Sequence, residues 1–417
     1  MAESRAQSFA NLAHHYRAKG EIEKAEKYEA KCRDLQGDPA VPVGQARTED
    51  SPSEAELMEV VTMVSMGVHD ALIKRFGNDI RQGIASAVST ALIRSGENER
   101  ALEYLSKLPE TQEVKLKHKA LELLEEMRNV DLSPEPRVHL LLLSYNRADC
   151  LENALRQLAA TDYSNYAVYI ADNNSQDGSW DILQKARDIF PEGVEVSIER
   201  FPTNIGRPAG HNWLLEKHDH SAAEFIAIGD DDLLEIPPSW LKDMIKTSRV
   251  FPKAAAIGGK ALNPGVPKVI HGGVRRFTSF GPTEIELTNN DEVVDYGQFD
   301  FVDRVDHVIG CLHIYRRDAL LEDIGLFDIR FSPCQYVDIE HHLRLRMKGY
   351  EVIYNGFIEF RHLRGMGKQA AADRALGGNS HGNRIKILYK YDQQEVIAML
   401  REEARRYDAW LDSPSLV

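Results

Sequence analysis

The sequence has few cysteine residues and spaces them widely, which excludes several classes of protein. None of the four belongs to a CxxC pair or stands at zinc-site spacing from histidine: Cys32, Cys150, Cys311 and Cys334. Neither a disulfide-stabilised secreted fold nor a structural zinc site is therefore expected. The pattern favours free thiols in a reducing compartment, and we expect a cytoplasmic protein.

Long apolar runs and an excess of positive charge are also absent. No uninterrupted apolar run approaches the length of a transmembrane helix, and the sequence from Met1 lacks the apolar core of a signal peptide. The formal net charge of -14 argues against a broad surface for nucleic acid, while a local basic pocket for phosphate groups stays possible. We expect no transmembrane segment and no nucleic-acid partner.

The chain is long enough for two or three domains that each bury a core. Residues 1–130 are predicted to be helical, with a flexible linker rich in Pro, Gly and Ser over 38–54. Two prolines in the segment Asp131–Pro136 break helical structure and mark the main boundary. We expect an α/β domain over 131–390 and a last helix over 391–417 that packs on the body of the protein.

Two helical hairpins are predicted near the N-terminus, over 9–37 and 84–108. They share a glycine, an alanine and a tyrosine at the same offsets: Gly20, Ala25 and Tyr28 in the first, and Gly96, Ala101 and Tyr104 in the second. This spacing resembles the tetratricopeptide helix pair, and an ordinary helical bundle explains it equally well. Repeat hairpins present concave surfaces to peptides, so residues 1–130 are a candidate docking surface for a protein partner.

The stretch Phe225–Leu234 joins an apolar, strand-like segment to three consecutive carboxylates. Clustered carboxylates repel one another unless a cation neutralises them, and Mg²⁺ and Mn²⁺ accept oxygen ligands. Asp230, Asp231 and Asp232 therefore fit a divalent cation site. They also fit the start of a helix that is capped by an acid and opened by the following prolines, and this stretch alone leaves both interpretations open.

Polar loops follow several predicted strands. The strand at 138–143 leads to Ser144–Arg147, the strand at 167–171 leads to Asp172–Ser179, and a strand around 194–198 leads to Asn204–Asn212. Strands that alternate with helices predict a mostly parallel sheet with helices on both faces. The carboxyl ends of its strands then form one rim, where α/β proteins bind their ligands.

In this order, the motifs resemble family 2 glycosyltransferases with the GT-A fold. The resemblance extends from about Val138 to His362. Its first part consists of four motifs. A Tyr-Asn-Arg-like loop lies at Ser144–Arg147, and an Asp-Asn-x-Ser-x-Asp-Gly-like loop lies at Asp172–Gly178. An Asn-x-Gly element with a later Asn comprises Asn204, Gly206 and Asn212, and an Asp-x-Asp element comprises Asp230 and Asp232. The GT-A fold implies an α/β, Rossmann-like, mostly parallel sheet flanked by helices, preceded here by the all-α hairpin region.

The later part of the resemblance carries the predicted general base. The segment 308–317 is similar to the family's acceptor-side strand. The segment Tyr336–Arg346 resembles the family's Glu-Asp-x-Asp-x-x-x-Arg helix, but Val337 stands where the family commonly has Glu. The resemblance therefore assigns the general base to Asp338, with Glu340 as the fallback.

Further roles follow from the resemblance. It implies a metal-dependent, inverting transfer of a sugar from a nucleotide diphosphate, UDP or dTDP, to a hydroxyl of a glycan, lipid or protein acceptor. Asp232 and His362 are the implied ligands of Mn²⁺ or Mg²⁺. Tyr145 is expected to lie against the nucleobase, Asp172 to accept from a pyrimidine N–H, and Asp230 to hold the ribose. The full set implied in binding the nucleotide sugar is Ser144, Tyr145, Arg147, Asp172, Asn174, Asn204, Gly206, Arg207, Asn212, Asp230 and Asp231.

Two other functions fit parts of the sequence. A sugar nucleotidyltransferase shares the nucleotide-binding sheet, but the glycine-rich phosphate loop of that class is absent from Ser144–Arg147. A catalytically inactive interaction protein fits the helical hairpins. Separately, the glycine-rich segment 365–383 fits a mobile lid over bound donor and a disordered loop equally well.

Overall fold

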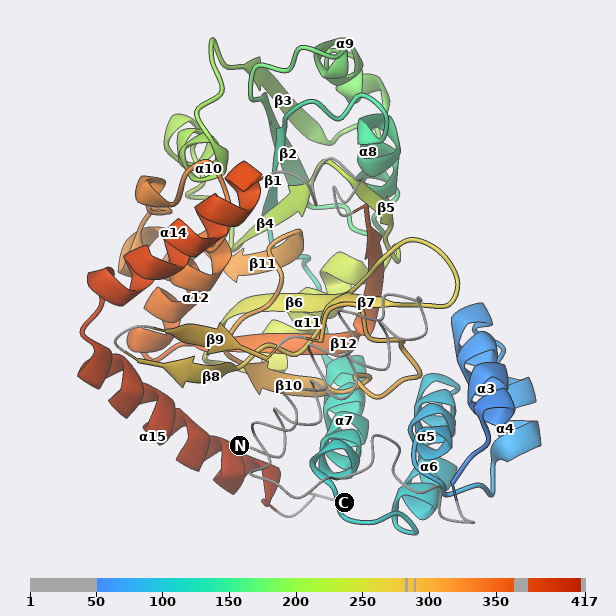
Figure 1. Cartoon of the computed structure of the whole chain (residues 1–417). Helices are drawn as coiled ribbons and strands as arrows, with labels where there is room; N and C mark the ends of the chain where they lie inside the picture. Colours follow the sequence, from blue (N-terminus) through green and yellow to red (C-terminus); the bar gives the residue numbers. More distant parts are fainter. Residues whose placement is uncertain (1–50, 282–283, 289, 364–373, 414–417) are drawn as a thin grey trace. The chain divides into compact units, whose positions relative to one another are not determined.

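The computed structural model, shown in Figure 1, describes residues 51–281, 284–288, 290–363 and 374–413. One compact unit begins at Glu54 and contains every element named below. The predicted hairpin at 9–37 and most of the predicted linker at 38–54 lie outside the described residues. Within those residues, no helix combines the length and the apolar character that crossing a membrane requires.

Among the described residues, five helices precede the sheet: α3 (Glu54–Met66), α4 (His69–Phe76), α5 (Ile84–Arg94), α6 (Asn98–Leu105) and α7 (Gln112–Asn129). Gly67 and Gly96 follow helix ends with φ values of 66° and 73°, a region that glycine enters without steric cost. Leu72 and Tyr104 belong to a buried cluster that these helices share. The helical prediction is confirmed over 54–129, and the tetratricopeptide character of α5 and α6 stays a prediction.

The main sheet is mixed. Its parallel half contains, in spatial order, β3 (Glu195–Arg200), β2 (Tyr166–Asp172), β1 (Val138–Ser144) and β4 (Phe225–Asp230). The order continues with β11 (Leu312–Arg316), antiparallel to both neighbours, and then β6 (Ala254–Leu262), β12 (Glu351–His362) and β10 (Val302–Val305). The α/β class with a flanked, mostly parallel sheet is confirmed, and within this order β11 and β10 run against the other strands, which makes the sheet mixed.

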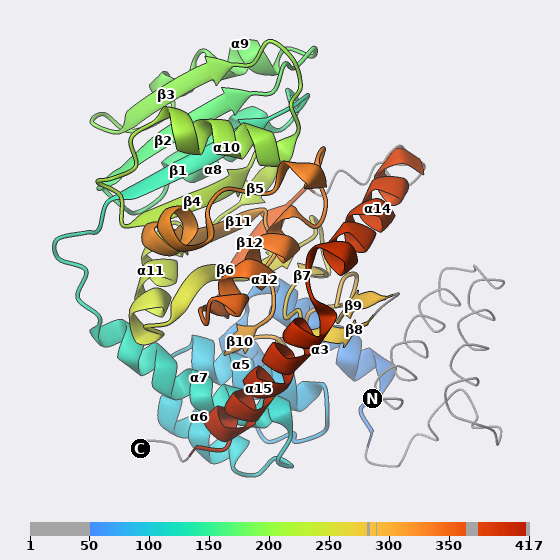
Figure 2. The same ribbon diagram turned by 90° about the vertical axis from the view of Figure 1, so that its left-hand side faces the viewer.

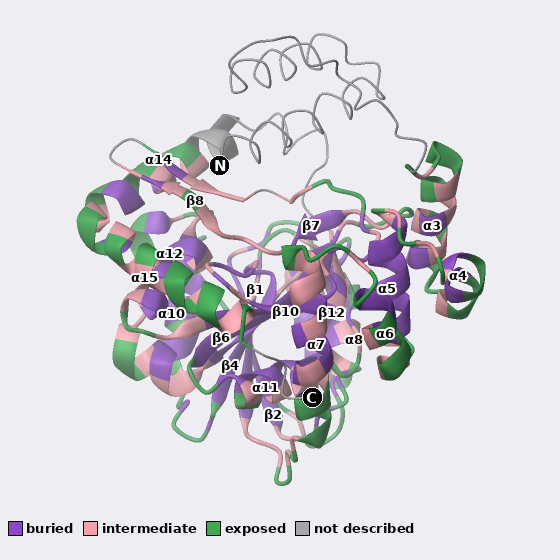
Figure 3. Cartoon of the chain, turned by 90° about the horizontal axis from the view of Figure 1, so that it is seen from below, coloured by how far each residue is buried: buried purple, intermediate pink, exposed green. Residues whose placement is uncertain are grey.

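Helices cover both faces of the sheet, as Figure 2 shows. One buried core includes residues of α8 (Leu151–Ala159), α9 (Ser179–Leu183) and α11 (Trp240–Val250), and the other includes residues of α10 (Arg207–Lys217), α12 (Val337–Met347) and α15 (Gln393–Leu411). Because side chains alternate along a strand, Leu140 and Leu142 of β1 enter the first core and Leu141 enters the second. Full burial of one such leucine contributes about 1.5–3 kcal/mol, and the strands lie in the buried interior of Figure 3.

Short elements complete the fold. β5 (Leu233–Glu235) pairs with β12, β7 (Ile270–Gly272) pairs with β6, and β8 (Phe277–Phe280) and β9 (Ile285–Leu287) form a separate two-stranded sheet. The remaining elements are α14 (Arg374–Lys390) and the helical turns Ala186–Asp188, Ala319–Ile324 and Ile329–Phe331.

The acids that follow β4 do not cap a helix, so the capping interpretation is wrong. β4 ends at Asp230 and β5 starts at Leu233, whereas α11 begins only at Trp240, after Ser239. The triple aspartate therefore occupies a tight turn between two strands, at the carboxyl end of β4.

The glycine-rich segment predicted as a lid or loop has two parts. Residues 364–373 lie outside the described residues, and the lid hypothesis for them stays a prediction. Residues 374–383 belong to α14, which packs on the body through the buried side chains of Ile387 and Leu388. Tertiary packing therefore holds a helix where the local sequence predicts a loop.

Candidate active site

The polar loops after β1, β2 and β4 meet at one rim of the sheet. The parallel register places Ser144 beside Asp172, and Leu143 beside Asp230. Because the three strands run in the same direction, their carboxyl ends deliver these side chains to a common edge. The sequence prediction of a shared rim is confirmed by this register.

Three potential metal ligands come together at this rim. Asp230, Asp232 and His362 each offer a ligand atom, and these atoms all lie within 4.8 Å of one another. The pairing of β5 with β12 explains the proximity, since His362 stands opposite Leu233 in the register and the backbone N–H of Leu363 donates to the carbonyl of Asp232 at 2.8 Å. A residue distant in sequence thus reaches the triple aspartate through a strand pair.

The acids and the histidine of this group perturb one another. Nε2 of His362 lies 2.6 Å from Oδ1 of Asp232 and 3.5 Å from Oδ2 of Asp230. Burial opposes the charged imidazole, but its pairs with the two carboxylates outweigh burial and raise the pKa of His362 to about 9. Burial, and then the charge of Asp232, raise the pKa of the Asp231 carboxyl to about 7.

Two arginines compensate the remaining negative charge. Arg147 lies 3.1 Å from Asp232 and Arg207 lies 2.9 Å from Asp230. Arg207 also donates to the carbonyl of Gly310 at 2.6 Å. Both arginines were predicted to bind the nucleotide sugar, and each stands beside a carboxylate where a phosphate group can also approach.

The three ligands fit a hard or borderline divalent cation. Mn²⁺ accepts two carboxylates and one imidazole as ligands, and Mg²⁺ accepts the two carboxylates. Asp232 and His362 are buried, at 4% and 8% exposure, and Nδ1 of His362 has no hydrogen-bond partner among the described residues. Sequence reasoning assigned Asp230 to the ribose, and the structure brings it into the candidate metal group as well.

Asp338 lies against the loop that contains Gly310. It is the second residue of α12, and its Oδ2 is 2.6 Å from the position that a Cβ on Gly310 would occupy, so only glycine leaves room for the carboxylate. The same oxygen lies 3.1 Å from Nε2 of His307. Burial opposes ionisation, but His307 and Arg207 outweigh it and hold the pKa of Asp338 well below its usual range.

Arg207 connects the two groups of acids. Its guanidinium pairs with Asp230 and bonds to the carbonyl of Gly310, and Gly310 touches the Asp338 carboxylate. The Asp338 side chain keeps 29% of its surface exposed, so an acceptor can reach it. Arg207 and Gly310 therefore link the candidate metal ligands to the predicted base.

Glu340, the fallback base, is already saturated with partners. It is fully buried, with Arg344 at 2.9 Å and Lys390 at 2.6 Å, and it accepts from the Tyr391 hydroxyl. Breaking such a buried cluster costs several kcal/mol, about 3–5. We correct the fallback for this reason: Glu340 braces α12 and α14, and Asp338 remains the predicted base.

Asp172, predicted to accept from a pyrimidine, is enclosed by protein groups. Its Oδ1 accepts from the backbone N–H of Ser175 at 3.1 Å, and its Oδ2 lies 3.0 Å from Nε of Arg200. The Asp172 side chain has no exposed surface, whereas the Arg200 side chain is 37% exposed. The guanidinium group of Arg200 lies over the ring of Trp180. Sequence reasoning missed Arg200, which is the solvent-exposed member of the Asp172–Arg200 pair.

Several other predicted nucleotide-binding residues shape the loops. Asn204 accepts from the backbone N–H of Gly206, and both amide atoms of Asn212 bond to the backbone of Phe327, at 2.8 and 2.9 Å. Asn174 has a φ of 65° within its turn. Asn212 is thereby tied to the backbone of Phe327, and its contact with the nucleotide sugar stays a prediction.

The ends of the first loop are placed differently. Ser144 is fully buried, and the Tyr145 side chain is 45% exposed. The backbone N–H of Tyr145 donates to Oδ2 of Asp231 at 3.0 Å, which fixes the loop to the triple aspartate. Tyr145 therefore offers a free aromatic face at the rim, as stacking against a nucleobase requires.

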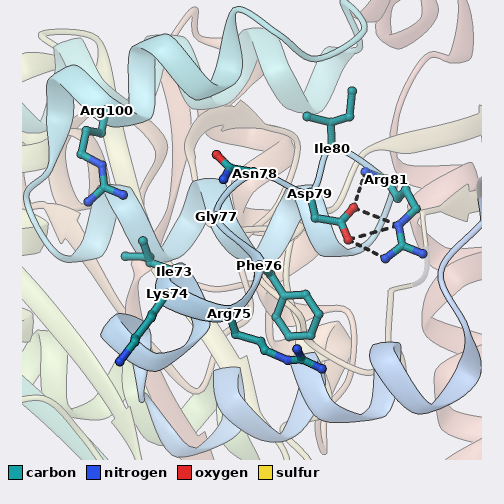
Figure 4. Close-up of a pocket in the computed structure, with 10 residues that line it drawn as sticks. All are labelled: Ile73, Lys74, Arg75, Phe76, Gly77, Asn78, Asp79, Ile80, Arg81 and Arg100. Atoms are coloured by element: carbon teal, nitrogen blue, oxygen red, sulfur yellow. Dashed lines mark hydrogen bonds and ion pairs between the residues drawn. The ribbon is translucent and has the colours of Figure 1, made fainter.

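A separate hollow of about 550 Å³ lies on the helical region, lined by residues 73–81 and Arg100 (Figure 4). None of the predicted site residues lines it. Its three arginines pair with acids: Arg75 with Glu59, Arg81 with Asp79 and Glu56, and Arg100 with Glu97. The hollow is therefore separate from the predicted site residues, which gather at the rim of the sheet.

Comparisons with known proteins address the same region. A family model described as glycosyl transferase family 2 matches residues 140–322. No curated protein sequence matches the chain.

Several solved structures are similar to this chain. The mannosyltransferase PcManGT from Pyrobaculum calidifontis, in complex with GDP-Man and Mn²⁺, has 16% identity over 80% of this chain and 88% of that chain, with a TM-score of 0.46. S. aureus TarS 1-349 in complex with UDP-GlcNAc has 16% identity over 66% of this chain and 73% of that chain, with a TM-score of 0.43. GalNAc-T7 with UDP, GalNAc and Mn²⁺ has 11% identity over 55% of this chain and 44% of that chain, with a TM-score of 0.43.

Proposed function

We propose that the chain, whose residues 140–322 form a glycosyl transferase family 2 domain, is a metal-dependent, inverting glycosyltransferase. It moves a sugar from a nucleotide diphosphate donor, a UDP- or dTDP-sugar, to an acceptor hydroxyl. The observation that carries the proposal is the arrangement around Arg207, which pairs with Asp230 on one side and, through Gly310, adjoins Asp338 on the other.

Asp338 is the general base of the proposed reaction. Its low pKa keeps the carboxylate ionised at neutral pH, ready to take the proton of the acceptor hydroxyl. The acceptor oxygen then forms a bond to the anomeric carbon while the bond from that carbon to the diphosphate oxygen breaks. The electron pair leaves with the diphosphate, and attack from the opposite face inverts the configuration.

The positive groups of the site serve the departing diphosphate. Arg147 and Arg207 stand beside Asp232 and Asp230, where their guanidinium groups can turn towards phosphate oxygens. Asp230, Asp232 and His362 would hold the divalent cation, Mn²⁺ or Mg²⁺, which when bound supplies positive charge that offsets the charge of the leaving group.

The nucleotide is expected at the loops after β1 and β2. The exposed ring of Tyr145 supports stacking on the nucleobase, and Arg200 offers its outer face beside Asp172. In this proposal Asp172 acts by orienting Arg200 rather than by touching the base. Asp231, with its raised pKa, fixes the Tyr145 backbone at the edge of the diphosphate site.

The acceptor is a glycan, a lipid or a protein. A docking role for the N-terminal helical region remains part of the proposal, with a polypeptide as the favoured partner, because paired helices such as α5 and α6 can present a peptide-binding surface. We also retain a cytoplasmic setting, which the free and buried thiols of Cys150 and Cys311 support.

The alternatives fit the site less well. A catalytically inactive interaction protein has no need to keep Asp230, Asp232 and Asp338 around one arginine. A sugar nucleotidyltransferase requires a glycine-rich phosphate loop after its first strand, and Ser144–Arg147 has no glycine.

A panel of nucleotide sugars tests the proposal. Thermal shift with and without Mn²⁺ identifies the donor, because a ligand that binds only the native state raises its melting temperature. With that donor, we expect transfer or hydrolysis to fall about 100-fold or more in Asp338→Asn. Asp232→Ala should abolish the effect of Mn²⁺ on donor binding, and the exposed helix residue Asp408, changed to Asn, serves as the control. Full activity in both Asp232→Ala and Asp338→Asn would end the proposal.

A further inference from the structure

A cluster of buried histidines lies behind Asp338. His307 precedes β11, His313 lies in β11, and His342 lies in α12, and each has at most 2% of its surface exposed. The ring centroids of His307 and His342 are 5.2 Å apart, and those of His313 and His342 are 5.8 Å apart. Burial makes a charged imidazole costly, so a group of three needs a reason beyond packing.

His307 is the member of the cluster that reaches the predicted base. Its Nε2 lies 3.1 Å from Oδ2 of Asp338, within hydrogen-bond reach. Neither ring nitrogen of His307 has an aligned hydrogen-bond partner among the described residues, so Nε2 has no competing partner to the nearby carboxylate. A proton on Nε2 would face Oδ2 of Asp338, which can accept it.

Backbone hydrogen bonds and an ion pair fix the segment that carries His307. The backbone N–H of His307 bonds to the carbonyl of Arg275 at 3.3 Å, next to an equivalent bond from Asp306 at 2.9 Å. Asp306 in turn pairs with Arg346 of α12 at 2.8 Å. The segment that carries His307 is thus tied to the helix that carries Asp338.

The neighbour of His307 is oriented as well. Nε2 of His342 lies 3.0 Å from the hydroxyl of Tyr315, which is fully buried. A Tyr315 hydroxyl that donates to His342 fixes the tautomer of that ring, and the His342 ring packs on His307. With Tyr315 as the donor, the proton of His342 lies on Nδ1, which has no hydrogen-bond partner among the described residues, and His342 supports His307 by ring packing alone.

We propose that His307 is a positioning residue for the reaction, which orients the Asp338 carboxylate and keeps it ionised. The inference rests on the proposed function, in which Asp338 is the general base. In this proposal His307 donates from Nε2 to Oδ2 and holds that oxygen against Gly310, while Oδ1 accepts from the backbone N–H of Ile339 at 3.0 Å and keeps a second lone pair for the proton of the acceptor. The proton of His307 stays on the imidazole throughout, and the proton taken from the acceptor goes to Asp338.

The other titratable groups that face Asp338 set the size of the effect. Arg207 of α10 also favours the ionised carboxylate, and His342 faces it from its own helix. Removal of His307 alone thus weakens the stabilisation of the carboxylate and leaves part of it. The expected signature is a shifted acid limb of the pH–rate profile rather than total loss.

A matched set of variants tests the proposal in the full-length protein. His307→Gln keeps an N–H near the Nε2 position, His307→Asn places it near Nδ1, and His307→Leu removes it. The control is His341→Leu, because His341 is fully buried in the same helix as Asp338 but bonds to the carbonyl of Gly325 at 3.1 Å. Each variant is assayed for melting temperature, for KM and kcat, and for the pH dependence of kcat/KM.

We expect His307→Leu to lower kcat by about 10- to 100-fold, since a misplaced base loses much of the 10²–10⁴-fold contribution of general-base catalysis. Its acid limb should move to higher pH, with KM for the donor nearly unchanged. His307→Gln should recover most of both properties. His341→Leu should lower the melting temperature without moving the acid limb.

The proposal is overturned if the acid limb of His307→Leu stays at the wild-type position, or if His341→Leu moves it equally. If His307→Leu does not fold, the comparison of Gln with Asn decides, and identical profiles of those two variants refute it. Failure of the proposed function is recognised separately, because Asp338→Asn would then retain full activity.

Discussion

Asn383 of α14 is expected to hold the loop that leads to Asp338. Its side-chain amide donates to three backbone carbonyls, at 2.8–3.0 Å, and the residue is fully buried. The acceptors are Phe331, Cys334 and Gln335. Two residues of this loop, Gln335 and Tyr336, have φ values of 74° and 63°. A non-glycine residue in this region costs about 1–3 kcal/mol, so the loop needs such support.

The change Asn383→Leu removes the donors at nearly constant volume. Loss of a buried donor costs about 1–3 kcal/mol, and we take about 2 kcal/mol. With about 360 residues and an unfolding entropy of about 2.1 cal/mol/K per residue, the melting temperature should fall by about 3 °C. We also expect a lower kcat, because the backbone that places Asp338 loses its tie to α14.

Differential scanning calorimetry and the transfer assay measure both effects. The control is Asn379→Leu, because the Asn379 amide bonds to one carbonyl among the described residues, that of Cys334 at 2.6 Å. A second change, Gln335→Gly, removes the steric cost at φ 74° and should restore about 1 kcal/mol in the Asn383→Leu background. An unchanged melting temperature and kcat in Asn383→Leu would show that this reasoning about the loop is incorrect.

Two further predictions concern stability. Lys260→Met should lower the free energy of unfolding, measured with urea, by about 3–5 kcal/mol. The change leaves Asp295 and Asp300 buried without the ammonium group that lies 2.5 Å from each. A loss below about 1 kcal/mol would contradict this, and Lys185→Met, at an exposed position, is the control. Burial, and then His220, lower the pKa of His139 from 6.5 to about 4. As the pH falls, the unfolded chain therefore binds a proton at this histidine before the folded chain does, and about 3 kcal/mol of stability is lost between pH 6.5 and pH 4. His139→Leu should flatten this dependence of stability on pH.

Local sequence patterns were sufficient for the elements that build the rim. The apolar run before Asp230 predicts β4, and its end at the first acid is observed. The proximity of Asp232 and His362 was implied only by resemblance to a family. No local sequence pattern links two residues that are so far apart along the chain. Pairing of β5 with β12 supplies the physical reason.

Long-range contacts explain what the sequence could not reveal. Asp172 sits in a family motif, yet its partner Arg200 comes from the end of the next strand, and side-chain pairing across strands has no signal in a single sequence. His307 lies just after β10 and forms an isolated β-bridge with Arg275, and nothing near it in the sequence marks it as a neighbour of Asp338. The glycines before Asn383 predict a loop. The buried hydrogen bonds from Asn383 to the loop before α12 instead favour a helix.

The strand pairing that joins His362 to Asp232 also has a consequence for synthesis of the protein. A ribosome releases the triple aspartate long before it releases the final strand, so a growing chain holds two of the three proposed ligands and lacks the third. Metal ions in the cell would find only a weak, incomplete site during most of translation. The proposed cation would therefore enter a nearly finished fold rather than nucleate it.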